Sequence, residues 1–521
     1  MASVAPLPRQ PKRRPATGVA VLYQWLDLPR LFTLAVVLIL LIPAIQPVTD
    51  PDFWWHLATG NWILAHHGVP HHDLFTYTVA GHSWITHEWL SELALGALFG
   101  FGRLTLVSLA LGLCTAAGFL LIYRAIDRRV NFVIAGLALA LGVAAANPIW
   151  GPRIQMVTFC LAALTYLWIK RFCEGNGRAL YALPLVMVLW ANLHGGFVVA
   201  FIFLGVALVA ELIKVVLGRP DAMPIVRLQH LGLIGLVSLL AIIINPNGWN
   251  LYIYAVQTQL SGVQQRFIVE WASPNFHMAE IRFFEAMLFL VVGGLAVVRK
   301  VELRSFLLFL CGLALALQSV RHLALFVIVG VPLLADLGQQ AWERVQGRVR
   351  LRPVPANALT FWINSLVLAL VALAVVGATA PVYGQALDGK RVAHDYPVQA
   401  ATFLAKNPPP GHMLNQYGWG GYLVYRLSAS GQKVFIFGDA ALAGDALLED
   451  YAHLIYLAPD QPKLLDRYQV NWVIFRDDDP LITELKQARG AWFVLKTTPD
   501  HAVIMMRDTP QNRSFAAHAG P

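Results

Sequence analysis

Residues 31–48 read LFTLAVVLILLIPAIQPV, and Thr49-Asp50-Pro51-Asp52-Phe53-Trp54-Trp55 follows at once. The apolar run approaches the length of about 20 residues that a helix needs to cross a bilayer. Because lipid offers no hydrogen bonds, the backbone of such a run must satisfy its own polar groups as a helix. We therefore interpret 31–48 as a membrane span, and the residues after it as the start of a loop outside the bilayer.

The rest of the chain repeats this pattern of apolar runs. Further runs cover residues 104–123, 131–147, 154–169, 179–193, 197–216, 229–245, 283–298, 305–320, 322–336 and 358–380. Of the 521 residues, 57% are hydrophobic and 13% are charged, and the mean hydropathy is +0.58. A soluble domain carries about 25% charged residues. The runs lack the alternation of β-strands, so the sequence predicts a polytopic α-helical membrane protein with about 11 transmembrane helices.

The net charge of +9 would suit a polyanionic partner, but its distribution indicates orientation in a membrane. Lysine and arginine gather in the N-terminal tail and in every second loop. The alternate loops before residue 381 contain no lysine, and their only arginines are Arg103, Arg153, Arg266, Arg282 and Arg321. By the positive-inside rule, this pattern predicts an inner (plasma) membrane protein with a cytoplasmic N-terminus and no nucleic-acid partner.

We expect four regions along the chain. Residues 1–30 are predicted to be a basic cytoplasmic tail that meets anionic membrane lipids. Residues 31–383 are predicted to form the transmembrane domain, and residues 384–510 an extracytoplasmic α/β domain. Residues 511–521 are expected to be a disordered tail.

Two of these regions carry finer expectations. The large first outer loop, 49–103, contains two amphipathic segments at 53–66 and 88–101, which we interpret as interfacial helices. The α/β domain is expected to form a mixed sheet, because helical and strand patterns alternate in it. Its expected elements are helices at 397–406 and 447–456, a glycine-rich turn at 417–421, and strands at 412–415, 433–437, 472–475, 492–496 and 502–506.

The first outer loop opens with two carboxylates, Asp50 and Asp52, on either side of a proline. We assign Trp54 and Trp55, which follow, to the aromatic belt at the membrane surface. One aspartate suffices to cap a helix N-terminus, and carboxylates at membrane depth are costly. We therefore favour catalysis or binding over capping for this aspartate pair.

The same loop is rich in histidine, with seven of the 16 histidines lying between residues 56 and 87. His71, His72 and Asp73 carry groups that ligate zinc or copper, so a divalent metal ion is a candidate cofactor. The spacing fits no closed structural site, and no cysteine joins these residues. We favour catalytic support instead. The residues considered for it are His56, His72, Asp73, His87 and Glu88.

Polar residues also mark the outer ends of later spans. They are Arg153, His194, Asn247, Glu270, Arg321 and His322. Each arginine could simply extend to lipid phosphates, but their concentration where other positive charge is scarce favours one shared cavity. Cations at the lipid boundary suit an anionic headgroup, above all a phosphate held by the planar fork of arginine.

These features together resemble the GT-C superfamily of membrane glycosyltransferases, in particular the lipid-phosphate-sugar-dependent enzymes akin to protein mannosyltransferases and aminoarabinose transferases. The resemblance rests on many spans, a large first outer loop opening with Asp50-Pro51-Asp52, loop arginines and histidines, and a soluble C-terminal domain. Segments 50–60, 191–196, 245–249 and 418–423 also resemble a widespread group of bacterial membrane proteins placed near GT-C enzymes. The chain departs from well-studied members in having Asp-Pro-Asp rather than adjacent acidic residues.

The resemblance implies a reaction. A polyprenyl-phosphate sugar would be the donor, and a protein, lipid or glycan hydroxyl would be the acceptor. Asp52, or Asp50 as the alternative, would act as the general base for attack with inversion, a role that contributes about 10²–10⁴-fold. The donor phosphate would bind to Arg153, Arg321, His322 and His194.

Two other functions remain open at this point. A transporter or flippase for lipid-linked sugars would use the same phosphate-binding residues without a base, but the sequence has no inverted repeat or paired broken helices. A non-enzymatic assembly or scaffold protein would depend on 384–521 and not on the aspartates. The segment Gly418-Trp419-Gly420-Gly421 is no nucleotide loop, since it lacks the strand–turn–helix spacing and the lysine.

Overall fold

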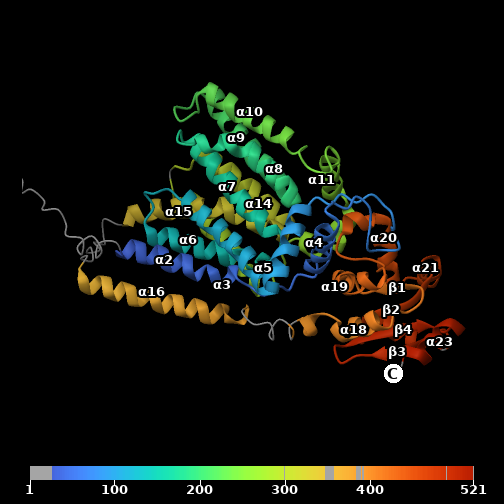
Figure 1. Cartoon of the computed structure of the whole chain (residues 1–521). Helices are drawn as coiled ribbons and strands as arrows, with labels where there is room; N and C mark the ends of the chain where they lie inside the picture. The colour runs from blue at the N-terminus through green and yellow to red at the C-terminus, as the bar shows by residue number, and fades with distance from the viewer. Residues whose placement is uncertain are drawn as a thin grey trace, which may run out of the picture.

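The computed structural model has two parts, a bundle of helices and a smaller α/β domain beside one end of it (Figure 1). The structure describes residues 26–298, 300–345, 357–382, 389, 392–488 and 490–519. The predicted tail up to residue 25, residues 346–356 and the junction at 383–388 lie outside the described residues. We call the end of the bundle that contacts the α/β domain the domain end, and the opposite end the far end.

Each predicted span corresponds to a helix or a pair of helices in the bundle. These are α2 (Leu28–Ile39), α3 (Leu41–Ala44), α5 (Trp89–Ala125), α6 (Phe132–Ala145), α7 (Gln155–Cys173), α8 (Leu183–Leu193), α9 (Val198–Val216), α10 (Ile225–Ala241), α13 (Arg282–Val297), α14 (Leu303–Gln318), α15 (Leu323–Val345) and α16 (Ala358–Thr379). In the described part of the chain, five helices are long and apolar enough to cross a membrane, and several others are shorter. The chain is a multi-pass membrane protein, and the number of 11 spans stays a prediction.

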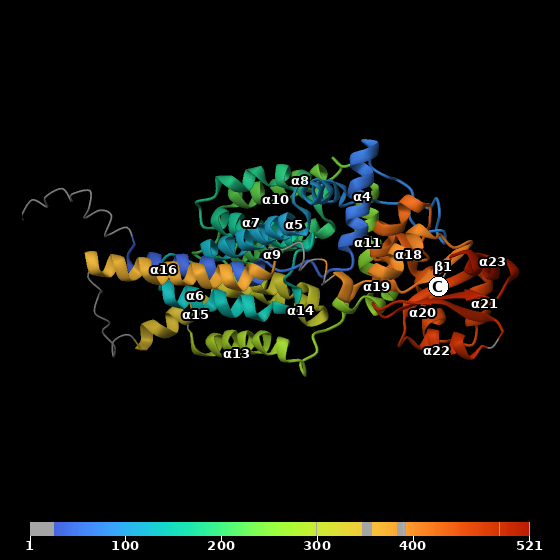
Figure 2. The same ribbon diagram turned by 60° about the horizontal axis from the view of Figure 1, so that its bottom comes forward.

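Helix α5 combines two predicted segments. Its backbone leaves the helical conformation at Gly102 and Arg103, where Arg103 has a φ of 53°. This break separates the predicted interfacial segment, 88–101, from the predicted span that follows it. The other predicted interfacial segment is α4 (Phe53–His66), which stands between the bundle and the α/β domain (Figure 2).

Helix α16 lies along the edge of the bundle beside α2 (Figures 1 and 2). Most of its surface is exposed, including Leu366, Leu370 and Leu373. The buried Asn364 donates a hydrogen bond to the backbone oxygen of Leu26 (2.8 Å) and fixes the two helices together. An apolar exposed face of this kind suits contact with lipid tails.

The α/β domain contains the mixed sheet that the sequence predicts. Its strand order is β1-β2-β4-β3, with β1 parallel to β2 and the other neighbours antiparallel. The strands are β1 (His412–Asn415), β2 (Val470–Arg476), β3 (Trp492–Thr497) and β4 (Ala502–Arg507). The helices are α18 (Val398–Lys406), α19 (Tyr417–Leu427), α20 (Ala440–Ile455), α21 (Gln461–Arg467), α22 (Pro480–Gln487) and α23 (Pro510–Ala519).

Three local expectations for this domain differ from the structure. The expected glycine-rich turn at 417–421 is the first part of α19, because its glycines allow close packing rather than chain reversal. The expected strand at 433–437 forms only an isolated bridge between Val434 and Thr76 of the first loop. Residues 510–519 form α23 instead of a disordered tail, and the buried Asn512 holds this helix by donating to the backbone oxygen of Arg507 (2.9 Å).

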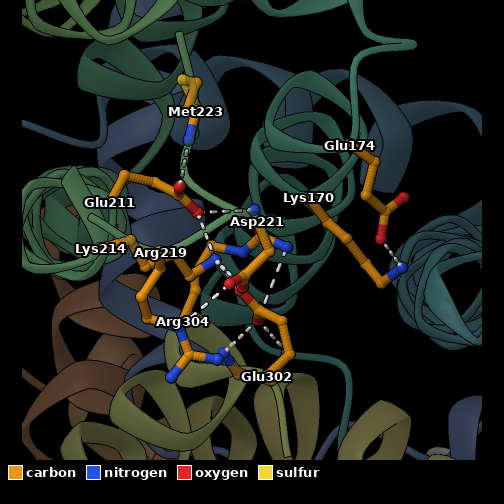
Figure 3. A network of polar contacts seen from close by, with 10 residues as sticks. Lys170, Glu174, Glu211, Lys214, Arg219, Asp221, Met223, Glu302 and Arg304 are labelled. Carbon is orange, nitrogen blue, oxygen red and sulfur yellow. Dashed lines mark hydrogen bonds and ion pairs between the residues drawn. The ribbon is translucent and has the colours of Figure 1, made fainter. Parts of the chain in front are cut away.

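A network of buried charges joins α9 to α14 at the far end (Figure 3). The ammonium group of Lys214 contacts Glu211 (2.9 Å) and Glu302 (2.6 Å), and Arg304 contacts Glu211 (3.5 Å). Buried charges are tolerated when they are paired and hydrogen-bonded. The network therefore holds the two helices in register at this end.

Candidate active site

A cavity of about 630 Å³ opens where the bundle, the first loop and the α/β domain meet. The titratable and charged side chains that line it include Asp50, Asp52, His56, His87, Glu88, Arg153, His194, Glu270, Arg321, His322 and Asp439. All except Asp439 are residues that the sequence analysis singled out. The five loops that the charge pattern assigns to one face of the membrane thus contribute to a single cavity.

Seven helices in the described part of the chain begin at this cavity. They are α4, α7, α9, α12 (Gly262–Phe267), α15, α19 and α20, and residues of the first turn of each line the cavity. Each helix N-terminus carries a partial positive charge of about half a unit and unpaired N–H groups. Their convergence makes the cavity favourable for an anionic ligand in spite of its carboxylates.

One wall of the cavity holds an ion triad of Asp50, Arg153 and Glu270. The Nε atom of Arg153 lies 3.4 Å from Oδ2 of Asp50, and its Nη1 donates to Oε1 of Glu270. Burial raises the pKa of Asp50, and Arg153 offsets part of this effect. Because Arg153 already pairs with two carboxylates, its positive charge is largely offset. It should therefore bind a phosphate more weakly than the sequence analysis predicts.

Asp52 lies beside this triad, at the N-cap position of α4. Its carboxylate does not cap the helix; its Oδ1 atom accepts a hydrogen bond from Nε1 of Trp55 (3.2 Å) instead. None of the described residues bonds to Oδ2. Burial and the neighbouring Asp50 raise the pKa of Asp52 well above its usual value. A carboxyl group with one uncommitted oxygen and a raised pKa has the properties of a general base.

Glu88 forms a second cluster with three histidines. Its carboxylate lies 3.4 Å from Nε2 of His56, 3.1 Å from Nε2 of His87 and 3.4 Å from Nε2 of His194. Burial alone would raise the pKa of Glu88, but the facing histidines lower it below its usual value. Glu88 therefore stays ionised, and the cluster fixes the first loop against the start of α9.

The hydrogen bonds of the histidines define their protonation. Nδ1 of His194 accepts from the backbone N–H of Gly196 (2.9 Å), so the proton of this neutral ring is on Nε2, facing Glu88. Burial lowers the pKa of His194 to about 4. Both nitrogens of His87 face acceptors, Glu88 and the backbone oxygen of Ile85. Burial opposes protonation of His87, but Glu88 outweighs it and raises the pKa of His87.

Arg321 is the remaining cationic side chain of the cavity, and His322 lies beside it just before α15. The guanidinium of Arg321 lies 5.9 Å from the ring centroid of Trp271. Within the described ranges, Arg321 forms no ion pair with a carboxylate. His322 donates from Nδ1 to the backbone oxygen of Leu315 (3.2 Å), so Nε2 can donate to a phosphate only when the ring is protonated. Arg321 is thus better placed than Arg153 or His194 to receive a phosphate.

Four predicted residues lie away from the cavity lining. Asp73 accepts hydrogen bonds from the backbone N–H groups of Phe75 and Thr76 and shapes a turn. His72 bonds to the backbone oxygen of Gly81, and Asn247 donates weakly to that of Thr86 (3.4 Å). Among the described residues, no three His, Cys, Asp or Glu side chains are arranged to hold a metal ion. The set His71, His72 and Asp73 accordingly does not form a metal site in the structure.

The α/β domain contributes cavity residues that the sequence analysis missed. Asp439 is half-buried, and its Oδ2 accepts from Nε1 of Trp84 (2.7 Å). Tyr417 and Gly438 line the cavity beside it. The available signal is an aspartate two residues after the predicted strand 433–437.

Comparison with solved structures identifies the fold. The sequence itself matches no protein-family model and no curated protein. The oligosaccharyltransferase of Archaeoglobus fulgidus in its apo form is similar with a TM-score of 0.55 and 12% identity, over 87% of this chain and 70% of that one. ArnT of Cupriavidus metallidurans in the apo state is similar with a TM-score of 0.51 and 14% identity, over 94% of this chain and 98% of that one.

Both of these proteins are GT-C glycosyltransferases. The chain has the GT-C fold. A second structure of the archaeal enzyme, AglB in complex with an inhibitory peptide and a dolichol-phosphate, is similar with a TM-score of 0.52 and 12% identity, over 92% of this chain and 75% of that one. The GT-C resemblance found in the sequence is thereby confirmed at the level of the fold.

Proposed function

We propose that this protein is a membrane glycosyltransferase that transfers a sugar from a polyprenyl-phosphate donor to an acceptor hydroxyl, with inversion. The observation that carries the proposal is the single cavity, which combines Asp52, a carboxylate with one uncommitted oxygen, with Arg321, a cation that pairs with no carboxylate among the described residues. Its place in a GT-C fold supports the same reaction. The dolichol-phosphate in the similar AglB complex supports a lipid-linked donor for this chain as well.

In this proposal, Asp52 is the general base. Its Oδ2 takes the proton of the acceptor hydroxyl, whose oxygen then attacks the anomeric carbon and displaces the lipid phosphate. The alternative base, Asp50, is bound to Arg153 and accepts the backbone N–H of Asp52 (3.1 Å). Because these partners stabilise the ionised form of Asp50, it is the weaker base of the two.

The donor phosphate is proposed to bind at Arg321 and His322, against the N-terminus of α15. Negative charge builds up on this phosphate as the bond to the sugar breaks, and fixed donors aimed at such charge stabilise the transition state. Arg153 has a different role in this scheme. It holds Asp50 and Glu270 and so keeps two extra negative charges away from the phosphate.

Lipid binding tests the proposal on the full-length protein in mild detergent. Native mass spectrometry with added undecaprenyl phosphate should show a complex that Arg321→Ala weakens at least about 10-fold, the loss expected for one charge-assisted hydrogen bond. Arg266→Ala is the matched control, because Arg266 is an exposed arginine of α12 (Gly262–Phe267) that does not line the cavity. Equal binding by the wild type and both variants would place the phosphate elsewhere.

Turnover separates an enzyme from a lipid carrier. Asp52→Asn should bind undecaprenyl phosphate as the wild type does, yet lose transfer by about 10²–10⁴-fold, the usual contribution of a general base. A variant that binds the lipid and still transfers the sugar at the wild-type rate would contradict the assignment of Asp52.

A further inference from the structure

The α/β domain packs directly on the segment that contains the two aspartates. A Cβ atom added at Gly421 would lie 2.7 Å from the backbone oxygen of Pro51. A Cβ atom added at Gly438 would lie 1.7 Å from Oδ1 of Asp52 and 3.0 Å from Nε1 of Trp55. Any side chain at 438 would therefore occupy the place of the Asp52 carboxylate. Only glycine leaves that space open.

The backbone around Gly438 is fixed from behind. The fully buried Asn415 accepts from the backbone N–H of Phe435 (2.9 Å) and donates to the backbone oxygen of Ile436 (2.9 Å). Gly420 packs so closely that a Cβ there would lie 2.3 Å from the same oxygen of Ile436. Since these contacts hold the backbone around Gly438 in place, a larger residue at 438 would displace the Asp52 side chain and not this backbone.

Asp52 thus contacts two fixed groups at the same oxygen. Trp55 donates a hydrogen bond to Oδ1, and a Cβ atom at 438 would lie against that oxygen and 3.0 Å from Nε1 of Trp55. In this orientation Oδ1 is engaged, and Oδ2 has no hydrogen-bond partner among the described residues. Groups that must meet a reacting atom need this kind of support, because a misplacement of about 1 Å costs about 100-fold in rate.

We infer that Gly438 is a positioning residue for Asp52. Through this residue the α/β domain sets the orientation of the carboxylate that acts as the catalytic base. The inference rests on the proposed function for the meaning of Asp52 and goes beyond it in assigning a task to the α/β domain. The shape of residue 438, and not its chemistry, is what matters. Gly438→Ala should leave the fold intact, since the atom that must yield is the end of a side chain.

Carbodiimide labelling across a pH series tests this inference without a known sugar or acceptor. A water-soluble carbodiimide with glycine methyl ester modifies protonated carboxyls, and peptide mass spectrometry reads the label on Asp52 in the full-length protein. In Gly438→Ala the displaced carboxylate regains water, so the labelling midpoint should move to lower pH. Trp55→Phe removes the hydrogen bond that stabilises the ionised form, so its midpoint should move to higher pH.

Gly418→Ala is the matched control, because a Cβ at this glycine of α19 meets nothing within 4 Å. It should titrate as the wild type does. A Gly438→Ala midpoint equal to that of the wild type would overturn the inference, whatever the lipid-binding result. If the wild type fails to bind undecaprenyl phosphate, the proposed function fails, whereas the labelling midpoints still decide whether Gly438 positions Asp52.

Discussion

At the scale of single residues, the pKa of Asp52 makes a prediction about rate. Burial and Asp50 raise this pKa, and a general base acts only when it is ionised. The rate of sugar transfer, measured as kcat/KM, should therefore still rise with pH well above about pH 5, where an ordinary aspartate is already fully ionised. A rate independent of pH between about 5 and 8 would contradict this assignment.

The sequence predicted the members of this site better than their roles. The charge pattern placed Arg153, His194 and Arg321 on one face because positive charge is scarce there. It could not show that Arg153 is paired with Asp50 and Glu270, or that the carboxylate of Glu88 contacts Nε2 of His194. Such pairings join positions more than 100 residues apart and depend on how the helices pack. For the same reason no sequence pattern indicates that Gly438 contacts Asp52.

At the scale of helices, the buried charges at the far end make a prediction about stability. Lys214 is 3% exposed and contacts Glu211 and Glu302. Lys214→Met would leave Arg304 as the remaining cation beside these carboxylates. We therefore expect a loss below the about 3–5 kcal/mol that removal of one partner of an isolated buried ion pair costs. The melting temperature in detergent should fall by several degrees.

Lys170→Met provides the control for that experiment. Lys170 pairs with Glu174 one helical turn away, outside the buried network (Figure 3). Such i,i+4 pairs contribute about 0.3–0.5 kcal/mol, so this variant should melt close to the wild type. If Lys214→Met melts at the same temperature as Lys170→Met, the network does not stabilise the bundle.

Helices were predicted well where their length and composition alone determine them. Each long apolar run became a helix, since a backbone in lipid has no other way to satisfy its polar groups. The prediction failed at 433–437, where residues 434–437 are all buried but their backbone partner is remote in the sequence. The backbone N–H of Val434 donates to the backbone oxygen of Phe75, which lies in the first loop and is far from Val434 in the sequence. No local pattern contains that information.

At the scale of the whole molecule, the contact between the first loop and the α/β domain decides whether the cavity exists as described. Trp54 and Trp55, which we had assigned to the aromatic belt, are 4% and 6% exposed beneath this domain. Trp54 packs edge-on against Tyr396 and Tyr422. The tryptophans therefore join the two parts of the protein instead of marking the membrane surface.

An engineered disulfide tests this contact directly. A Cβ atom at residue 438 would lie 2.7 Å from Cγ of Asp52, close enough for the Cβ–Cβ separation of about 3.5–4.5 Å that a disulfide spans. The double variant Asp52→Cys/Gly438→Cys should form a bond under mild oxidation, seen by mass spectrometry as two thiols that alkylate only after reduction. Asp52→Cys/Gly418→Cys should not, since a side chain at 418 meets no other residue. Equal cross-linking of both pairs would mean that the α/β domain moves freely over the first loop, and a cavity wall that moves in this way could not hold Asp52 in place.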